Sequence, residues 1–365
     1  MARIEVFVGS YTTDLGWVQG KGLGIGSYQL DTETGALSLL STMRTDNPSF
    51  LALHPSGNYL YANNEASHRV DSSDDSISAF AIAADGTLSL INQQASHGKA
   101  PCFVSVDPEG DFAYLANFIG GNSVVYPIAP NGGLECDSDR ISPVDSGTDQ
   151  PIPHAHTIKA SPSGRYLLAC DLGLDKIFIH QLDRRTAKLN RHGELLVPRG
   201  SGPRHIAFHP SGRFVYLISQ DAGTITAFAW DDDLGVLTDL QTASTVPADF
   251  SGEPAASEIQ VHPEGQWLYA SNRGHNSVVI FRIDAASGLL SLVGFQASLG
   301  ITPRNFTLTP SGDMLLVANQ DSDQIVVFRL DAATGLLSEL DRHAVPTPVC
   351  MVCRPRSSRP RIAPG

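Results

Sequence analysis

Short stretches of alternating apolar and polar residues run through the whole chain and recur around a Pro-x-Gly turn. The turn occurs six times, as HPSG at 54–57, DPEG at 107–110, SPSG at 161–164, HPSG at 209–212, HPEG at 262–265 and TPSG at 309–312. An alternating stretch such as PRHIAFHP precedes each turn, and another such as FVYLISQ follows it. A period of two is typical of β-strands, so each turn is expected to connect the strands of an antiparallel hairpin.

Each hairpin is followed by a third apolar run, such as TITAFAW or VVIFRI, and then by a turn segment such as DAASG that leads into a fourth run. Successive turn prolines are 53, 54, 48, 53 and 47 residues apart. A repeat of about 50 residues with four strands and no helical period indicates the blade of a β-propeller.

The two ends of the chain supply the strands of one further blade. The segments EVFVGSYT, GLGIGSYQL and ALSLLSTM near the N-terminus resemble a second, third and fourth strand, and TPVCMVCRP near the C-terminus resembles a first strand. A mixed blade closes the ring and removes the open sheet edges. The sequence therefore predicts an all-β, seven-bladed propeller in one domain, residues 1–353, followed by a flexible basic tail at 354–365.

Composition and charge narrow the class of partner. The 365 residues carry a formal net charge of -13, which disfavours a general nucleic-acid binder. No apolar stretch approaches the ~20 residues of a membrane span, so we expect a soluble cytoplasmic protein without a membrane partner. Five cysteines argue against a disulfide framework, and Cys350 and Cys353 of the CMVC tetrad are expected to be buried thiols on opposite faces of a strand. A closed ring needs no partner to cover its edges, so a monomer is expected.

Hairpin register predicts which residues surround one mouth of the central channel. With the turn proline as position zero, position -6 is expected to lie opposite position +9, and positions -6, -5, +9 and +10 to border the mouth. Their polar residues concentrate in the third to sixth repeats: His156, Asp171, Arg204, Gln220, Glu258, Arg273, Arg304 and Gln320. Glu65 occupies position +10 of the first repeat.

Three arginines at one mouth of an acidic protein predict an anionic ligand, because guanidinium pairs with carboxylate or phosphate through two hydrogen bonds. The imidazole of His156 adds proton transfer, a combination suited to hydrolysis of a charged ester or lactone. The alternative is that each arginine is a salt-bridge partner and that Glu65 and Asp171 are solvated or bond the backbone. No metal-ligand spacing or glycine-rich phosphate loop occurs, so neither metal nor cofactor is expected.

The segments VGSYT at 8–12, PHAHTIKASPSGRYLL at 153–168, GSGPRHIAFHPSGRFVY at 200–216 and SNRGHNSVVIF at 271–281 together resemble the lactonase seven-bladed propellers. These include cycloisomerase-type 6-phosphogluconolactonases and carboxy-cis,cis-muconate cyclases. The resemblance implies a metal-independent site in the mouth, with His156, Arg204 and Arg273 as its functional residues. The family's glutamate after the GPRH strand is replaced here by Gln220. Glu258 is the first candidate to substitute for it, Glu65 is more remote, and His156 acting alone is a third possibility.

Two classes of function follow. The first is a lactonase for an anionic sugar lactone such as 6-phosphogluconolactone, with Arg204, Arg273 and Glu258 assisting His156 in catalysis and with Arg304, Gln220, Gln320, Asp171 and Glu65 binding substrate. The second is a non-catalytic or retuned propeller that keeps the anion pocket, because an amide at Gln220 cannot act as a base. A muconate-lactone cyclase-type reaction stays open within the enzyme class.

Overall fold

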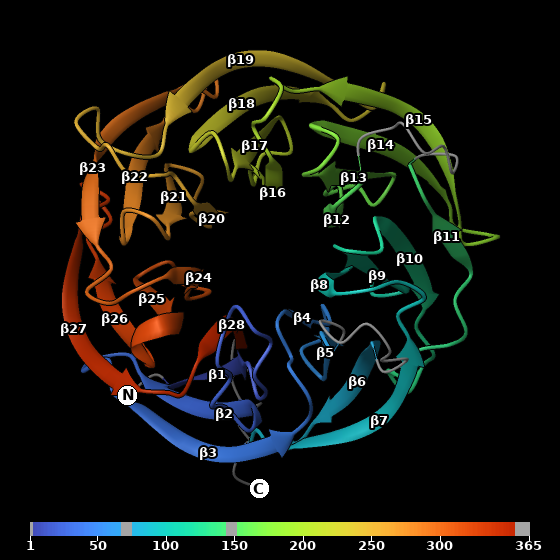
Figure 1. Ribbon diagram of the computed structural model, residues 1–365, viewed down its shortest axis with the longest axis horizontal. Helices are drawn as coiled ribbons and strands as arrows, with labels where there is room; N and C mark the ends of the chain where they lie inside the picture. The colour runs from blue at the N-terminus through green and yellow to red at the C-terminus, as the bar shows by residue number, and fades with distance from the viewer. Residues whose placement is uncertain (1–2, 67–74, 144–151, 355–365) are drawn as a thin grey trace, which may run out of the picture.

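The computed structural model describes residues 3–66, 75–143 and 152–354 and arranges them as seven four-stranded antiparallel sheets in a ring (Figure 1). Six sheets follow the chain order from an inner to an outer strand. Their strands are β4 (Leu51–Leu53), β5 (Tyr59–Asn64), β6 (Ser76–Ile82) and β7 (Leu88–Ala95); β8 (Pro101–Val106), β9 (Phe112–Asn117), β10 (Asn122–Pro127) and β11 (Asp139–Ile141); β12 (Ala155–Ala160), β13 (Tyr166–Asp171), β14 (Lys176–Asp183) and β15 (Lys188–Leu196); β16 (Pro203–Phe208), β17 (Phe214–Ser219), β18 (Thr224–Asp231) and β19 (Val236–Ser244); β20 (Ala256–Val261), β21 (Trp267–Asn272), β22 (Ser277–Ile283) and β23 (Leu290–Ala297); β24 (Pro303–Leu308), β25 (Met314–Asn319), β26 (Gln324–Leu330) and β27 (Leu337–Ala344). A short 3-10 turn, η1 (Gln320–Ser322), follows β25. The predicted seven-bladed propeller is confirmed.

The seventh sheet combines both ends of the chain in the order β28–β1–β2–β3. Its strands are β28 (Pro348–Arg354), β1 (Arg3–Ser10), β2 (Gly24–Asp31) and β3 (Leu37–Arg44). Antiparallel pairing of β1 with β28 sets Phe7 opposite Val352 and Val8 opposite Met351, which closes the ring as the terminal segments predict. Of the tail expected at 354–365, Arg354 ends β28, and the residues after it lie outside the described part of the chain.

The core is divided among the junctions between neighbouring sheets. At the junction of the β12–β15 and β16–β19 sheets, for example, Leu168 of β13 packs in one cluster with Leu217 of β17 and Trp230 of β18. Each of the other six junctions has its own apolar cluster of this kind. Because every sheet is covered on both faces by its neighbours, the inner strands are held rigidly around the channel.

The Pro-x-Gly turns connect neighbouring blades as well as neighbouring strands. Nε2 of His54 lies 3.0 Å from the carbonyl oxygen of Gly110 in the next turn, and His209 and His262 make the same contact with Gly265 and Gly312 at 2.9 and 3.1 Å. All three of these glycines have positive φ, and a Cβ on any of them would collide with the histidine ring. These turn histidines therefore have a structural role.

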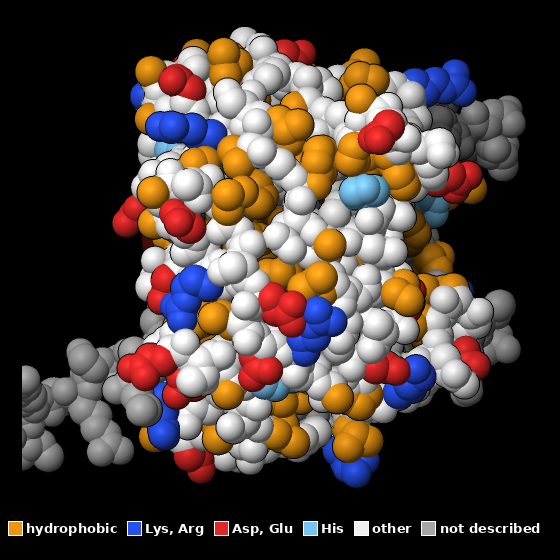
Figure 2. All heavy atoms as spheres, turned by 90° about the vertical axis from the view of Figure 1, so that its left-hand side faces the viewer, with side chains coloured by type: hydrophobic (Ala, Val, Ile, Leu, Met, Phe, Trp, Pro, Cys, Tyr) orange, Lys and Arg blue, Asp and Glu red, His pale blue; other side chains and the backbone are white. Residues whose placement is uncertain are grey.

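The two cysteines of β28 lie on opposite faces of the strand, as the sequence predicts. Cys350 packs with the apolar cluster on one face of β28 and Cys353 with the cluster on the other, and all five cysteines are free thiols. Apolar and charged side chains are mixed over the outer strands on the side of β23 and β27 (Figure 2). Within the ranges that the structure describes, no helix is long and apolar enough to span a membrane.

Candidate active site

The inner strands carry an extra residue where they reach the mouth of the channel. In β12, Ala155 pairs with Asp171 and Thr157 with Cys170, so His156 lies in a β-bulge between them. The same shift occurs at Arg204 in β16 and at Arg304 in β24. The predicted pairing of position -6 with position +9 is therefore wrong by one residue in these blades, because the bulge places position -7 there. Bulges re-aim side chains, and here the bulged residue is the histidine or arginine of each strand.

The three predicted arginines lie close enough to repel one another. Burial, followed by the charge of Arg304, lowers the pKa of Arg204 to about 10. Burial and the charges of Arg204 and Arg304 hold the pKa of Arg273 well below its ordinary value. Among the described residues, no carboxylate forms an ion pair with any of the three. Burial lowers the pKa of Arg304, but Tyr11 and Glu65 outweigh burial and raise it above its ordinary value. The mouth thus contains three guanidinium groups, none of which forms a direct ion pair with a carboxylate of the described residues.

Each guanidinium group is held by neutral partners. Nη1 of Arg204 donates to the carbonyl oxygen of Ser257 at 2.8 Å, and its buried Nε has no hydrogen-bond partner. Nη2 of Arg273 donates to Oε1 of Gln220 at 2.6 Å. Arg204 is almost fully buried, whereas Arg273 and Arg304 keep part of their surface, so an entering anion meets these two first.

Arg304 is stacked against two aromatic residues that the sequence analysis did not select. Its guanidinium carbon lies 5.5 Å from the ring centre of Tyr11 and 5.2 Å from that of Trp17. The hydroxyl of Tyr11 donates to Oε2 of Glu65 at 2.9 Å, which links Glu65 to the arginine cluster through this ring. β1 ends at Ser10 just as β5 ends at Asn64, so Tyr11 corresponds to Glu65 at position +10. Aligning β1 with the other second strands would have found it.

Two histidines adjoin the arginines. The ring centres of His156 and His205 are 5.0 Å apart, and Nη1 of Arg204 lies 3.3 Å from both ring nitrogens of His205. Burial and the charge of Arg204 hold the pKa of both histidines well below the ordinary value, so both are neutral near pH 7. Nδ1 of His156 is buried without a hydrogen-bond partner. A neutral imidazole has the lone pair that a general base needs, and an anion bound at the arginines would offset the charge that lowers its pKa.

Glu258 lies one layer deeper than the arginines. Its Oε2 accepts a hydrogen bond from Nδ2 of Asn305 at 2.6 Å and lies 3.4 Å from Nδ1 of His205, and its Oε1 accepts from the backbone N–H of Ile259 at 3.0 Å. Burial, opposed by the charge of Arg204, raises the pKa of Glu258 to about 7. The carboxyl group therefore reaches His205 rather than His156.

The remaining predicted residues are less closely tied to the cluster. Oδ1 of Asp171 accepts hydrogen bonds from the backbone N–H groups of His154 and Leu174, which is the backbone role considered as its alternative. Gln320 is buried and donates to Oδ1 of Asp321, while its own Oε1 is unpartnered. The blade assignments of the predicted residues are correct, and they occupy one sector.

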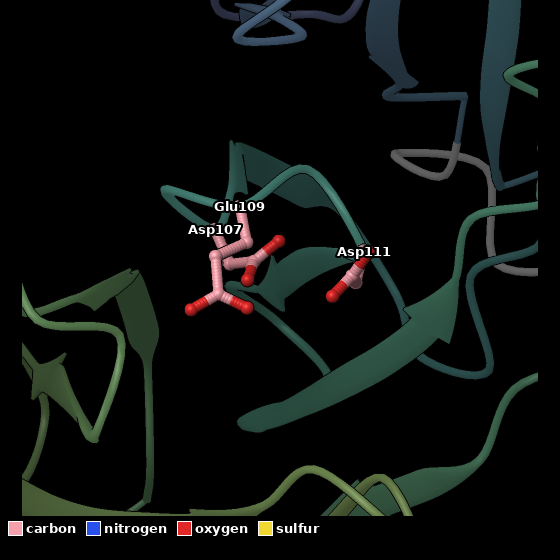
Figure 3. A group of neighbouring side chains, drawn as sticks. All are labelled: Asp107, Glu109 and Asp111. Carbon is pink, nitrogen blue, oxygen red and sulfur yellow. The ribbon is translucent and has the colours of Figure 1, made fainter.

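One group of acidic residues has the spacing of a cation site, but a guanidinium group occupies it. Asp107, Glu109 and Asp111 lie in the β8–β9 turn, and their ligand atoms are within 4.8 Å of one another (Figure 3). Arg184 forms ion pairs with all three, at 2.8, 2.7 and 2.5 Å. These three carboxylates are therefore paired with an arginine of the neighbouring blade.

Comparison with known proteins places this geometry in a family. The family model described as Lactonase, 7-bladed beta-propeller matches residues 5–353. A 6-phosphogluconolactonase of Bacillus subtilis strain 168 is 31% identical over 310 residues, which cover 84% of this chain and 85% of the relative. A 6-phosphogluconolactonase of Formosa agariphila is 35% identical over 314 residues, covering 83% and 86%. The structure of a periplasmic gluconolactonase of Pseudomonas aeruginosa aligns with a TM-score of 0.89 at 30% identity, covering 97% of this chain and 99% of that one. This chain belongs to the seven-bladed lactonase propeller family.

Proposed function

We propose that this protein is a metal-independent lactonase that hydrolyses an anionic sugar lactone, such as 6-phosphogluconolactone, in the mouth of the channel. The observation that carries the proposal is the cluster of Arg204, Arg273 and Arg304, which forms no direct ion pair with a carboxylate of the described residues and which adjoins the neutral imidazole of His156. Relatives named 6-phosphogluconolactonase support the substrate class.

Arginine supplies both binding and transition-state stabilisation in this scheme. Arg273 and Arg304, which are partly exposed, hold the acid group of the lactone through charge-assisted hydrogen bonds. Arg204 is buried beside His205, and its free Nε is a donor for the oxyanion that forms at the lactone carbonyl. Asp171, Gln320 and Glu65 border the same sector, with Glu65 acting through Tyr11.

His156 transfers the proton in the hydrolysis. A water oxygen forms a bond to the lactone carbonyl carbon, and the water proton passes to the neutral imidazole. The bond between that carbon and the ring oxygen then breaks, and the ring oxygen takes the proton from the imidazolium. The products are an open hydroxy acid and an unchanged histidine.

The test is an assay of lactone disappearance above spontaneous hydrolysis, across several phosphorylated and carboxylated sugar lactones. We expect Arg273→Met to lower kcat/KM by about 100-fold, because it removes a charge-assisted pair with the acid group of the substrate. Arg199→Met, at an exposed arginine in the β15–β16 connection, is the matched control. No excess turnover with any of these lactones would overturn the proposal.

A second candidate is a non-catalytic or retuned propeller that binds an anionic ligand. The observation that favours it is Gln220, whose amide oxygen accepts from Arg273 at 2.6 Å where the family pattern predicts a carboxylate. An amide positions the arginine without neutralising it, which leaves more positive charge for a ligand. A muconate-type cyclase is tested with the same protein by supplying the corresponding open-chain acid.

The variant Gln220→Glu separates the two candidates. In a catalytically active parent, we expect it to raise KM for the anionic lactone about tenfold, because the new carboxylate competes for the guanidinium of Arg273. The control is Gln181→Glu, at an exposed position of strand β14. Activity that appears only in Gln220→Glu would instead identify the natural protein as a binding propeller.

Two further expectations belong to the proposal. All five cysteines are free, which supports a reducing compartment, and we propose the cytoplasm. Ring closure by β1 and β28 supports a monomer, because it leaves no inner edge for a partner.

A further inference from the structure

The mouth is separated from the rest of the channel by a layer of aromatic rings. The ring centres of Phe50 and Phe103 are 4.4 Å apart, and those of both phenylalanines lie within 5.6 Å of the ring centre of His205. Below these rings is a cavity of about 460 Å³, which is lined by Lys159, Glu258 and mainly apolar residues. It extends to Pro263 and Pro310 in the turns at the other end of the inner strands.

A line of titratable groups crosses this layer. Oε2 of Glu258, which lines the cavity, lies 3.4 Å from Nδ1 of His205. The ring centre of His205 is 5.0 Å from that of His156, which belongs to the mouth. His205 is therefore in contact with both compartments.

Lactone hydrolysis needs an exit for one proton. After the ring oxygen has taken the proton of the attacking water, the new carboxylic acid still carries one proton, and at neutral pH this proton is released. The three guanidinium groups around the product oppose any accumulation of positive charge, so the proton leaves more readily through neutral or anionic acceptors than through the arginines.

We propose that His205 and Glu258 relay this proton from His156 into the central channel, away from the face at which substrate binds. The relay rests on the proposed lactonase function and deepens it. The proton passes from the product acid to His156. The rings of His156 and His205 share no hydrogen bond in the structure, so a turn of the His156 ring is needed to pass the proton to Nε2 of His205. The proton on Nδ1 of His205 passes to Glu258, and Glu258 releases it to solvent in the channel. His205 is left with its proton on Nε2, and a turn of its ring restores the starting tautomer, so no oxidant or other co-reactant is needed.

The charges around the relay suit each step. Glu258 faces Arg204 and His205 from β16, Lys159 from β12, Asn305 from β24 and Cys350 from β28. Burial raises its pKa to about 7, so both of its protonation states are populated at neutral pH. Burial and Arg204 lower the pKa of His205, so His205 passes a proton on and does not retain it. Lys159 also lines the cavity, and burial lowers its pKa.

The first test is the pH dependence of kcat in Glu258→Gln, with Glu264→Gln in the exposed turn of the same blade as control. We expect Glu258→Gln to lower kcat about tenfold with KM nearly unchanged, which is less than the ~100-fold of a direct general base. It should also remove an inflection near pH 7 that Glu258→Asp restores. A profile of Glu258→Gln that matches wild type, or a loss that is equal at every pH, would overturn the relay.

A second measurement does not depend on turnover. Titration of the wild-type protein followed by NMR should show the ring nitrogens of His205 shifting as the carboxyl carbon of Glu258 titrates, and Glu258→Gln should abolish that shift. If the chemical shifts of the His205 ring nitrogens do not change as Glu258 titrates, the relay is overturned, even when the enzyme is active. If the protein turns over no lactone but the His205 shifts still follow the titration of Glu258, the proposed function is overturned. The contact between His205 and Glu258 is then only a pH-sensitive pair.

Discussion

Glu258 illustrates how one buried carboxyl group makes the stability of the fold depend on pH. Its folded-state pKa of about 7 lies above the ordinary value of 4.5, so the folded protein binds this proton more tightly than the unfolded chain. The sign follows from linkage: between those two values the stability that the proton contributes is progressively lost as pH rises. A carboxyl group that stayed ionised in the fold would give the opposite slope.

We therefore expect Glu258→Gln to be more stable than wild type at pH 8.5 and nearly equal to it at pH 5. The gain at high pH is about 3 kcal/mol, from 1.36 kcal/mol for each pKa unit. Urea unfolding of both proteins at the two pH values measures it, with Glu264→Gln as the control. A difference between variant and wild type that does not change with pH would contradict the shifted pKa.

The candidate site was predictable where a repeat supplied a reference position. Arg204, His156 and Arg304 occupy one position of the Pro-x-Gly repeat, so their convergence followed from counting residues. Counting from the turn proline did not select Tyr11 and Trp17, because their blade lacks a Pro-x-Gly turn. The deeper placement of Glu258 was not predictable either, since it depends on which side of the aromatic layer the side chain lies.

At the scale of single elements, alternation predicted the strands but not their bulges. A bulge adds one residue without disturbing the apolar positions further along β12 or β16, so the hydrophobic pattern contains no signal for it. The pattern likewise cannot show which loop covers the mouth. The segment between β1 and β2 does so with Trp17, whose ring packs edge to face on that of Tyr11 with ring centres 5.2 Å apart and which remains 46% exposed.

This loop leads to a prediction about ligand binding. Trp17→Ala removes one of the two rings against which Arg304 is stacked. We expect KM for an anionic lactone to rise about fivefold with little change in kcat, because the loss of one cation–π contact weakens the positioning of Arg304. Isothermal titration with the product acid measures the same loss. Leu23→Ala, at an exposed position of the same loop, is the control, and an unchanged KM in Trp17→Ala would show that Arg304 does not need the ring.

Buried tyrosines of three second strands, Tyr61, Tyr216 and Tyr269, each bond to the next blade, and removal of their hydroxyls should affect stability alone. The hydroxyl of Tyr216 donates to the carbonyl oxygen of Gly288 at 3.0 Å, as Tyr269 does to Gly335 at 2.9 Å. We expect Tyr216→Phe to lower the free energy of unfolding by about 1 kcal/mol, the typical value for such a bond, and to leave KM unchanged.

The control for this prediction is Tyr59→Phe. The hydroxyl of Tyr59 makes only a long contact of 3.5 Å near the surface. Tyr59→Phe should therefore lower the free energy of unfolding by less than Tyr216→Phe does. Equal losses in the two variants would mean that the blade-to-blade bond contributes little.

At the scale of the whole molecule, ring closure turns residues distant in sequence into neighbours. Tyr11 from the first strand meets Arg304 from the sixth repeat only because β28 pairs with β1. The terminal strands made this closure predictable, as their four segments match the four strands of a repeat. The same closure concentrates positive charge at one mouth of a protein whose net charge is -13. Salt should therefore weaken binding of an anionic ligand there.

The contribution of side chains to ring closure can be tested at an ion pair between the first and the last strand of the chain. Nη1 of Arg354 in β28 lies 2.8 Å from Oε2 of Glu5 in β1, and the side chain of Glu5 is only 3% exposed. Arg354→Ala removes this largely buried ion pair between the two terminal strands, so we expect a loss of about 3 kcal/mol in the free energy of unfolding. Adding Glu5→Gln to this variant should recover part of the loss, because the buried charge is then gone. Thermal and urea unfolding would be compared with Arg199→Ala, an exposed arginine on another blade connection. If Arg354→Ala unfolds no more readily than that control, the pairing of β1 with β28 holds the ring closed through backbone hydrogen bonds and apolar packing alone.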